Sequence, residues 1–257
     1  MSNKPTLILV PGAWHSTETW DKVSSLLEAK HYKCVPVTLP STAGNDSATF
    51  RDDIDAVRNY IAVETTQGHD VVVVVHSYGG AVGQSAIKGL TRVNQNAPSS
   101  LSDQSGYVLG LVMIASGFVQ TGVSFIDGLG GKPPPSWRAD PSGFAIITAP
   151  PRELFYHDLP EAEGSHWATK LKKQSLKALM EGGEHSYAGW KDVPVWFLAS
   201  TEDKAFPVQA QKMFVQVAKD SGADITLREV ESSHSPMLSR PEETVDFIIE
   251  AVASFTE

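Results

Sequence analysis

The chain has 257 residues, of which 41% are hydrophobic, and a formal net charge of −9 at pH 7. That length allows one α/β domain with a substantial buried core, and the acidic balance argues against a nucleic-acid partner, whose phosphates need a basic surface. The single cysteine, Cys34, excludes an internal disulfide, and with no visible leader or bilayer-spanning apolar run we expect a cytoplasmic protein without membrane contact.

Strands and helices are predicted to alternate along most of the chain. Short apolar runs bounded by turn residues predict buried strands, whereas apolar residues at three- and four-residue spacing predict helices. We expect strands near residues 6–10, 32–37, 71–75, 107–115, 193–199 and 224–230. We expect helices near residues 20–27, 50–61, 79–86, 207–218 and 242–255. Capping boxes are predicted at Thr49 and Asp52 and at Ser239 and Glu242. This alternation indicates an α/β fold with a mostly parallel sheet and helices on both faces.

Five consecutive valines, residues 71–75, lead into His76 and Ser77. A run of β-branched residues indicates a strand buried on both faces, and the glycines after Ser77 recur at the spacing of one helix face. Ser77 is therefore predicted to lie on a sharp turn, the geometry of a nucleophile elbow, although an ordinary glycine-rich turn with an incidental serine would give the same pattern. Val75 stands where a small residue is usual. Either Gly79 and Gly80 face the valine and make room for it, or the elbow is distorted enough to slow acylation.

Residues 117–190 break the alternation with clusters of Gly and Pro and many aromatic residues. We interpret residues 1–257 as a single domain and 117–190 as a cap inserted over the sheet, because this segment has too few regular elements for a core of its own. The cap is expected to be helical, with one helical stretch around residues 165–180. Its aromatic side chains suit either general packing or the wall of an apolar pocket. The polar stretch 94–105 predicts a surface loop.

Three loops that follow predicted strands supply a serine, an acid and a histidine, in the chain order Ser77, Asp203, His234. The carboxyl ends of parallel strands meet at one edge of a sheet, so we expect these residues to converge. This order is typical of the α/β-hydrolase architecture. Taken singly, His234 could be a loop histidine and Asp203 a helix-terminal acid, and Glu202 is a competing acid.

Five motifs spread over nearly the whole chain resemble the α/β-hydrolases of the small esterase branch, which includes plant methylesterases, hydroxynitrile lyases and microbial esterase-like relatives. The matching stretches are VPGAWH at 10–15, VHSYGG at 75–80, FYHD at 155–158, TED at 201–203 and HSPMLSRP at 234–241. The chain departs from the family pattern at Pro11, where a histidine is common, and at Val75. The resemblance implies an α/β-hydrolase fold with a helical cap insertion, and it favours Asp203 over Glu202.

The chemistry of these residue types assigns each a role. Ser77 would be the nucleophile, His234 its general base and later acid, and Asp203 the residue that fixes the imidazole tautomer. The backbone N–H groups of Ala13 and Tyr78 would form the oxyanion hole. No cofactor is needed, and the spacing of the eight histidines predicts no metal site. The residues predicted to line the substrate pocket are Trp14, His15, Phe118, Phe155 and Trp167.

The leading functional prediction is hydrolysis of a small to medium apolar carboxylic ester. Lactone or thioester cleavage uses the same machinery and stays open. A hydroxynitrile-lyase-like activity is a second alternative, but in those enzymes a lysine follows the catalytic histidine, and here Ser235 does. A third is a ligand-binding protein that keeps the hydrolase fold. The expected partner is a small-molecule ester, with no nucleic acid or membrane, and the protein is expected to be a monomer or homodimer.

Overall fold

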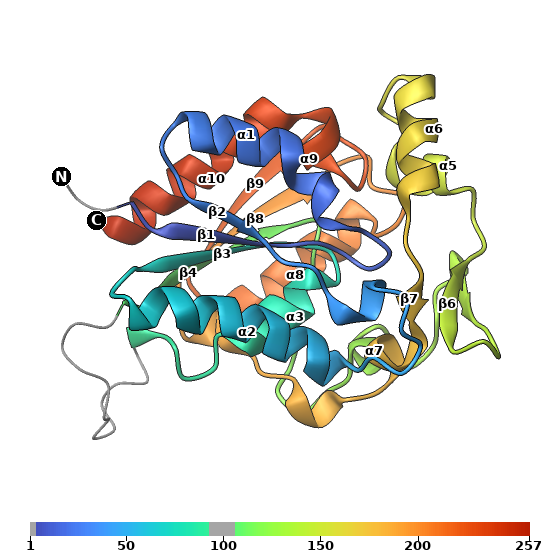
Figure 1. The fold of residues 1–257 in the computed structure, drawn as a ribbon, viewed down its shortest axis with the longest axis horizontal. Helices are drawn as coiled ribbons and strands as arrows, with labels where there is room; N and C mark the ends of the chain where they lie inside the picture. The colour runs from blue at the N-terminus through green and yellow to red at the C-terminus, as the bar shows by residue number, and fades with distance from the viewer. Residues whose placement is uncertain (1–3, 93–105) are drawn as a thin grey trace.

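The computed structural model describes residues 4–92 and 106–257 and contains a six-stranded parallel sheet in the order β2-β1-β3-β4-β8-β9 (Figure 1). Every predicted strand is present, with bounds within a few residues of those expected. The strands are β1 (Thr6–Val10), β2 (Cys34–Pro36), β3 (Val71–His76), β4 (Val108–Ile114), β8 (Val195–Ser200) and β9 (Ile225–Val230).

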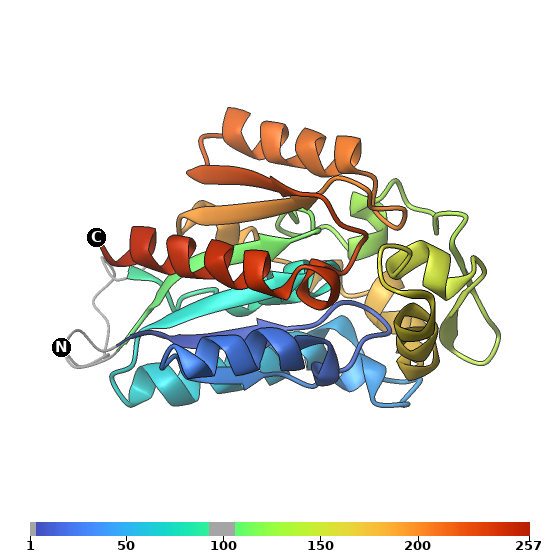
Figure 2. The ribbon, with the colours of Figure 1, turned by 90° about the horizontal axis from the view of Figure 1, so that it is seen from above.

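The valine strand β3 is buried on both faces and separates two hydrophobic cores. Val71, Val73 and Val75 pack in one core, and Val72 and Val74 pack in the other, as the two-residue period of a strand requires. Side chains of α2 (Phe50–Thr66), α3 (Gly79–Ala86) and α8 (Val208–Asp220) join the first core. Side chains of α1 (Asp21–Ala29) and α10 (Pro241–Thr256) join the second. Figure 2 shows α1 and α10 together on one face of the sheet.

The two predicted capping boxes have different outcomes. Thr49 and Asp52 form the expected reciprocal box at the start of α2. The prediction at Ser239 and Glu242 is wrong, because Ser239 ends a separate short helix, α9 (Pro236–Ser239), and α10 begins at Pro241 without a side-chain cap. Proline is favoured in the first turn of a helix, where its missing N–H breaks no intrahelical hydrogen bond. Pro236 begins α9 and Pro241 begins α10, so the segment forms two helices.

The cap segment, residues 117–190, contains a small antiparallel sheet in the order β5-β6-β7 as well as helices. Its strands are β5 (Trp137–Ala139), β6 (Phe144–Ile147) and β7 (Gln174–Ser175), and its α-helices are α4 (Phe125–Gly128), α5 (Pro151–Phe155), α6 (Glu161–Lys170) and α7 (Leu176–Met180). The single helical stretch predicted around 165–180 is therefore wrong, because pairing of β7 with β6 separates α6 from α7. Figure 1 places the cap at the opposite end of the sheet from the two termini.

Short 3-10 helices complete the described secondary structure: η1 (Thr17–Trp20), η2 (Pro40–Thr42), η4 (Gly183–His185) and η5 (Gly189–Lys191). The surface loop predicted at 94–105 lies outside the described residues. Within residues 4–92 and 106–257, no helix combines the length and the apolar character needed to cross a bilayer.

Candidate active site

Ser77 occupies a strained turn at the carboxyl end of β3. Its φ is +50°, an unusual value for a residue with a side chain. The turn is held by hydrogen bonds from the Ser77 N–H to the Ile114 carbonyl (3.1 Å) and from the Ser116 hydroxyl to the Ser77 carbonyl (2.7 Å). Tyr78 then caps α3. This is the sharp strand-to-helix turn that the valine run and the glycines predicted.

Val75 is accommodated by a different glycine from the two expected. A Cβ atom placed on Gly83 would lie 2.5 Å from Val75 Cγ1, so the absence of a side chain at Gly83 leaves room for the valine. Gly79 and Gly80 face other segments. The helix can therefore pack closely on β3 although Val75 is larger than the residue usual at this position.

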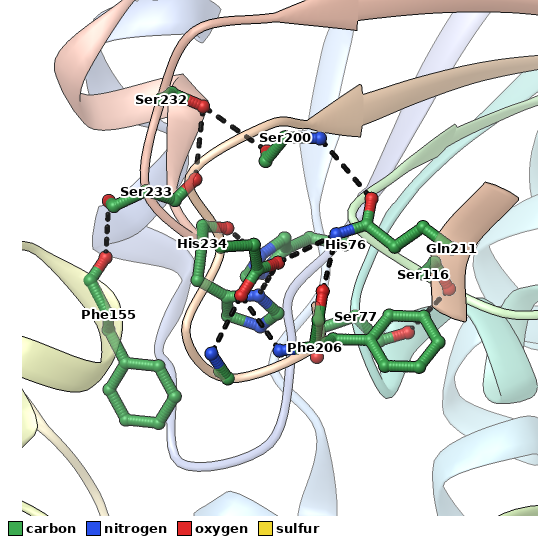
Figure 3. Close-up of polar contacts among 12 residues, drawn as sticks. His76, Ser77, Ser116, Phe155, Ser200, Phe206, Gln211, Ser232, Ser233 and His234 are labelled. Atoms are coloured by element: carbon green, nitrogen blue, oxygen red, sulfur yellow. Dashed lines mark hydrogen bonds and ion pairs between the residues drawn. The ribbon is translucent and has the colours of Figure 1, made fainter. Parts of the chain in front are cut away.

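The carboxylate of Asp203, in the loop after β8, accepts a hydrogen bond from Nδ1 of His234, in the loop after β9, at 2.7 Å. Figure 3 shows His234 in the same loop as Ser232 and Ser233. The Asp203 side chain is fully buried and its second oxygen accepts the N–H groups of Ala205 and Phe206, each at 2.8 Å. A carboxylate accepts only, so Nδ1 of His234 carries the proton and Nε2 is left as the basic nitrogen. The competing acid Glu202 is exposed.

Gln211, on α8, supports this pair and was not among the predicted site residues. Its side-chain amide donates to Asp203 Oδ2 (3.0 Å) and to the Phe206 carbonyl (2.6 Å), while its oxygen accepts the Ser200 N–H at 3.2 Å. The residue is completely buried. The sequence contains a signal for it, because Gln211 shares the inward face of the helix with Val215 and Ala218 and is the polar member of that face.

Two other buried histidines lie beside His234 and hold loops in place. His76 donates through Nε2 to the His234 carbonyl at 2.8 Å, and burial, followed by repulsion from His234, lowers its pKa well below the usual 6.5. His15 is within hydrogen-bond distance of the Ala13 carbonyl (Nδ1, 2.7 Å) and of the Tyr156 hydroxyl (Nε2, 2.8 Å), and burial lowers its pKa to about 4. Both rings are therefore neutral at pH 7.

A cavity of about 250 Å³ contains Ser77 and His234 in its wall. The predicted pocket residues Trp14, Phe118 and Phe155 also line it, together with the unpredicted Phe206 and Phe214. Among the described residues, no Asp, Glu, Lys or Arg side chain lines this cavity. The Ser77 hydroxyl makes no hydrogen bond to any described residue, His234 included.

His15 and Trp167, also predicted for the pocket, do not line this cavity. They lie in a separate shallow crevice that Tyr156 shares. His15 is buried, with its two ring nitrogens within hydrogen-bond distance of the Ala13 carbonyl and the Tyr156 hydroxyl, and Trp167 lies on α6 of the cap.

The backbone N–H groups of Ala13 and Tyr78 donate to no residue that the structure describes, and both residues line the cavity. The cap holds the loop that carries Ala13 through the adjoining Trp14. Trp14 donates its backbone N–H to Gln174 Oε1 (3.2 Å) and its indole N–H to the Ala145 carbonyl (2.9 Å), and its carbonyl accepts the Lys172 N–H at 2.8 Å. The cap therefore fixes the position of one of the two free donors.

Comparison with known proteins agrees with this architecture. The model of the alpha/beta hydrolase family matches residues 7–247. The chain is 29% identical over 259 residues to the α/β hydrolase nvfD of Aspergillus novofumigatus, covering 99% of each protein. It is 23% identical over 275 residues to methylesterase 1 of Arabidopsis thaliana, covering 98% of this chain and 97% of that protein. The solved structure of polyneuridine aldehyde esterase superposes with a TM-score of 0.73 at 21% identity, covering 99% of this chain and 100% of the other, which shows a shared fold. The chain therefore belongs to the alpha/beta hydrolase family, which confirms the resemblance and the fold class predicted from its sequence.

Proposed function

We propose that the protein is a serine hydrolase that cleaves a small to medium, largely apolar carboxylic ester through an acyl-enzyme. One observation carries this proposal: a single cavity contains Ser77 on its strained turn, the base His234 paired with a buried Asp203, and two backbone N–H groups without a protein acceptor. The similarity to methylesterase 1 and polyneuridine aldehyde esterase supports an ester as the bond that is cleaved.

Acylation would begin with attack of Ser77 Oγ on the ester carbonyl carbon while His234 Nε2 takes the hydroxyl proton. Asp203 would stabilise the imidazolium that forms, and its other hydrogen bonds keep its carboxylate from turning away. The carbonyl oxygen, now negatively charged, would accept the N–H groups of Ala13 and Tyr78. Collapse of the tetrahedral intermediate breaks the C–O bond, and the alcohol leaves with the proton from His234.

Deacylation repeats these steps with water. His234 would take a proton from the water as its oxygen attacks the acyl carbon, and would return a proton to Ser77 Oγ as the carboxylic acid leaves. The neutral state of His15 and His76 supports His234 as the proton carrier, because burial keeps the other two rings uncharged at pH 7.

The cavity wall supports an uncharged substrate. With no Asp, Glu, Lys or Arg among its described lining residues, a charged group on the substrate would lose its hydration without gaining a partner. Aromatic residues such as Phe118, Phe155 and Phe206 would contact apolar acyl or alkyl groups. This favours a neutral ester over a thioester of a phosphate-bearing carrier.

The test is hydrolysis of p-nitrophenyl esters by the wild type and by Ser77→Ala. We expect turnover by the wild type and a loss of at least about a thousandfold in kcat for the variant, since the nucleophile is removed. Ser47→Ala, which changes an exposed serine outside the cavity, is the matched control and should keep wild-type turnover. Equal rates for the wild type and Ser77→Ala would contradict the proposal.

A further inference from the structure

A buried polar cluster joins the nucleophile turn to α2, and the proposed chemistry does not use it. Asp53, on α2, is completely buried, and its Oδ2 accepts the Tyr78 hydroxyl at 2.8 Å. Its carboxylate also accepts both the N–H (2.9 Å) and the hydroxyl (2.6 Å) of Ser41. Tyr78 directly follows Ser77, so this carboxylate lies one side chain away from the reacting centre.

Burial of the Asp53 carboxylate lowers the stability of the folded protein, so its presence calls for a functional explanation. No Lys, Arg or His forms an ion pair or hydrogen bond with Asp53 among the described residues. Burial raises its pKa to about 6, although the hydrogen bonds from Ser41 and Tyr78 oppose the rise. A protein that buries a carboxylate without a cation is commonly less stable than one with an apolar residue of similar size at the same position.

The side chain of Tyr78 is fixed at both ends. Its hydroxyl is held by Asp53 and lies 3.4 Å from the Ala178 carbonyl on α7 of the cap. Its ring lies against Phe50 of α2 and edge-on to Phe125 of α4, with centroids 6.2 and 5.2 Å apart. Burial, followed by repulsion from Asp53, raises the pKa of the Tyr78 hydroxyl well above 10, so it remains the donor.

We propose that Asp53 is a positioning residue that anchors the Tyr78 side chain and thereby aims the Tyr78 backbone N–H at the oxyanion. This inference rests on the proposed function, in which that N–H is one of the two oxyanion donors. The Tyr78 peptide follows the strained Ser77, and its N–H donates to no described residue. The carbonyl of the same peptide accepts the Ser116 hydroxyl (2.7 Å) and the Gly80 N–H (2.9 Å), and the anchored Tyr78 side chain adds a restraint at the other end of the peptide.

The test uses three variants with the wild type. Tyr78→Phe removes only the hydroxyl, and Asp53→Ala removes its acceptor. Asp53→Asn keeps the shape, because the amide oxygen can accept the Ser41 N–H while the amide nitrogen donates to the two hydroxyl oxygens. Tyr187→Phe is the matched control, since the Tyr187 hydroxyl donates to Asp192 at the same 2.8 Å but lies outside the cavity wall.

We expect Tyr78→Phe and Asp53→Ala to lower kcat for p-nitrophenyl butyrate about ten- to a hundredfold, less than outright loss of an oxyanion donor, with KM changed by less than about threefold. Asp53→Asn should recover most of kcat, and Tyr187→Phe should match the wild type. Wild-type kcat in Tyr78→Phe, or a kcat in Asp53→Asn as low as in Asp53→Ala, would overturn the inference. If Asp53→Ala does not fold, Tyr78→Phe and Asp53→Asn decide the question.

The rate at which a fluorophosphonate labels Ser77 separates this inference from the proposed function, because the phosphoryl oxygen also occupies the oxyanion hole. We expect labelling to be about tenfold or more slower in Tyr78→Phe than in the wild type and in Tyr187→Phe. Wild-type labelling without ester turnover would contradict the ester proposal alone. Equal labelling rates in all three proteins would contradict the role of Asp53 and Tyr78 alone.

Discussion

The Asp203 carboxylate is held by four donors, which come from three parts of the chain. Two are backbone N–H groups of its own loop, one is His234 and one is Gln211 from α8. Because Gln211 also accepts the Ser200 N–H, it connects the end of β8 with the loop that follows it. A single side chain thus fixes both the acid and the strand end that carries it.

Substitution of Gln211 should affect both stability and activity. Gln211→Ala leaves the buried Ser200 N–H without an acceptor, so we expect the free energy of unfolding to fall by about 1–3 kcal/mol. The Asp203 carboxylate also loses a donor, and kcat should fall in parallel. Urea unfolding and ester kinetics measure the two effects. Gln216→Ala, at an exposed glutamine of the same helix, is the control, and equal behaviour of both variants would contradict this role.

Asp53 should give the folding equilibrium a distinct pH dependence. Its pKa is about 6 in the folded protein against an ordinary value of 3.8. The folded state binds the Asp53 proton more tightly than the unfolded state does. The contribution of this proton to the free energy of unfolding is therefore complete below the ordinary pKa and is lost as the pH rises through about 6. The difference between the two pKa values corresponds to about 3 kcal/mol in the free energy of unfolding.

Asp53→Asn cannot titrate at this position and should therefore gain stability relative to the wild type by up to about 3 kcal/mol between about pH 4 and pH 7. Urea unfolding at the two pH values measures the change. A stability difference between the two proteins that stays constant with pH would show that Asp53 does not titrate in this range.

Helix α8 covers part of the sheet and also lines the cavity. Its inward face packs in the core, while Met213 and Val217, one turn apart, line the cavity and remain 59% and 53% exposed. Leu129 of the cap, 38% exposed, lines the same cavity. The cavity rim is therefore apolar, which favours substrates whose apolar part extends towards the surface.

A charge on this rim should change the preference for chain length. Met213→Glu is expected to lower kcat/KM for p-nitrophenyl octanoate about tenfold more than for the acetate, since lost contact with about two methylene groups has that effect. Gln216→Glu places the same charge on α8 outside the cavity wall and should leave the ratio unchanged. An unaltered octanoate-to-acetate ratio in Met213→Glu would contradict this assignment of the rim.

Most strands of the central sheet could be predicted because they are local apolar runs, of which the valines of β3 are the clearest, whereas β9 includes the polar residues Thr226, Arg228 and Glu229. The cap could not, because its strands are two to four residues long and pair across distance, as Phe144 does with Ser175. Ser77, Asp203 and His234 could be placed at one sheet edge from topology. The contacts that hold the loop of Ala13 could not, because Trp14 meets Gln174 across 160 positions and His15 meets Tyr156 across 141.

Across the whole molecule, the cap and the sheet are joined at the points where the proposed chemistry needs rigidity. Trp14 ties the loop carrying Ala13 to the cap, His15 ties the same loop to Tyr156, and Tyr78 reaches from the nucleophile turn to both α2 and α7. The two N–H groups proposed as oxyanion donors are thus held by contacts outside their own loops. Such preorganised donors supply a large part of the rate enhancement in acyl transfer.

Peptide mapping after reaction with a fluorophosphonate shows whether Ser77 is the nucleophile. We expect one equivalent of label on the peptide that contains Ser77, in the wild type and in Ser47→Ala, and none in Ser77→Ala. Label on a different residue, or an unlabelled Ser77 in a folded protein that hydrolyses esters, would contradict this role for Ser77.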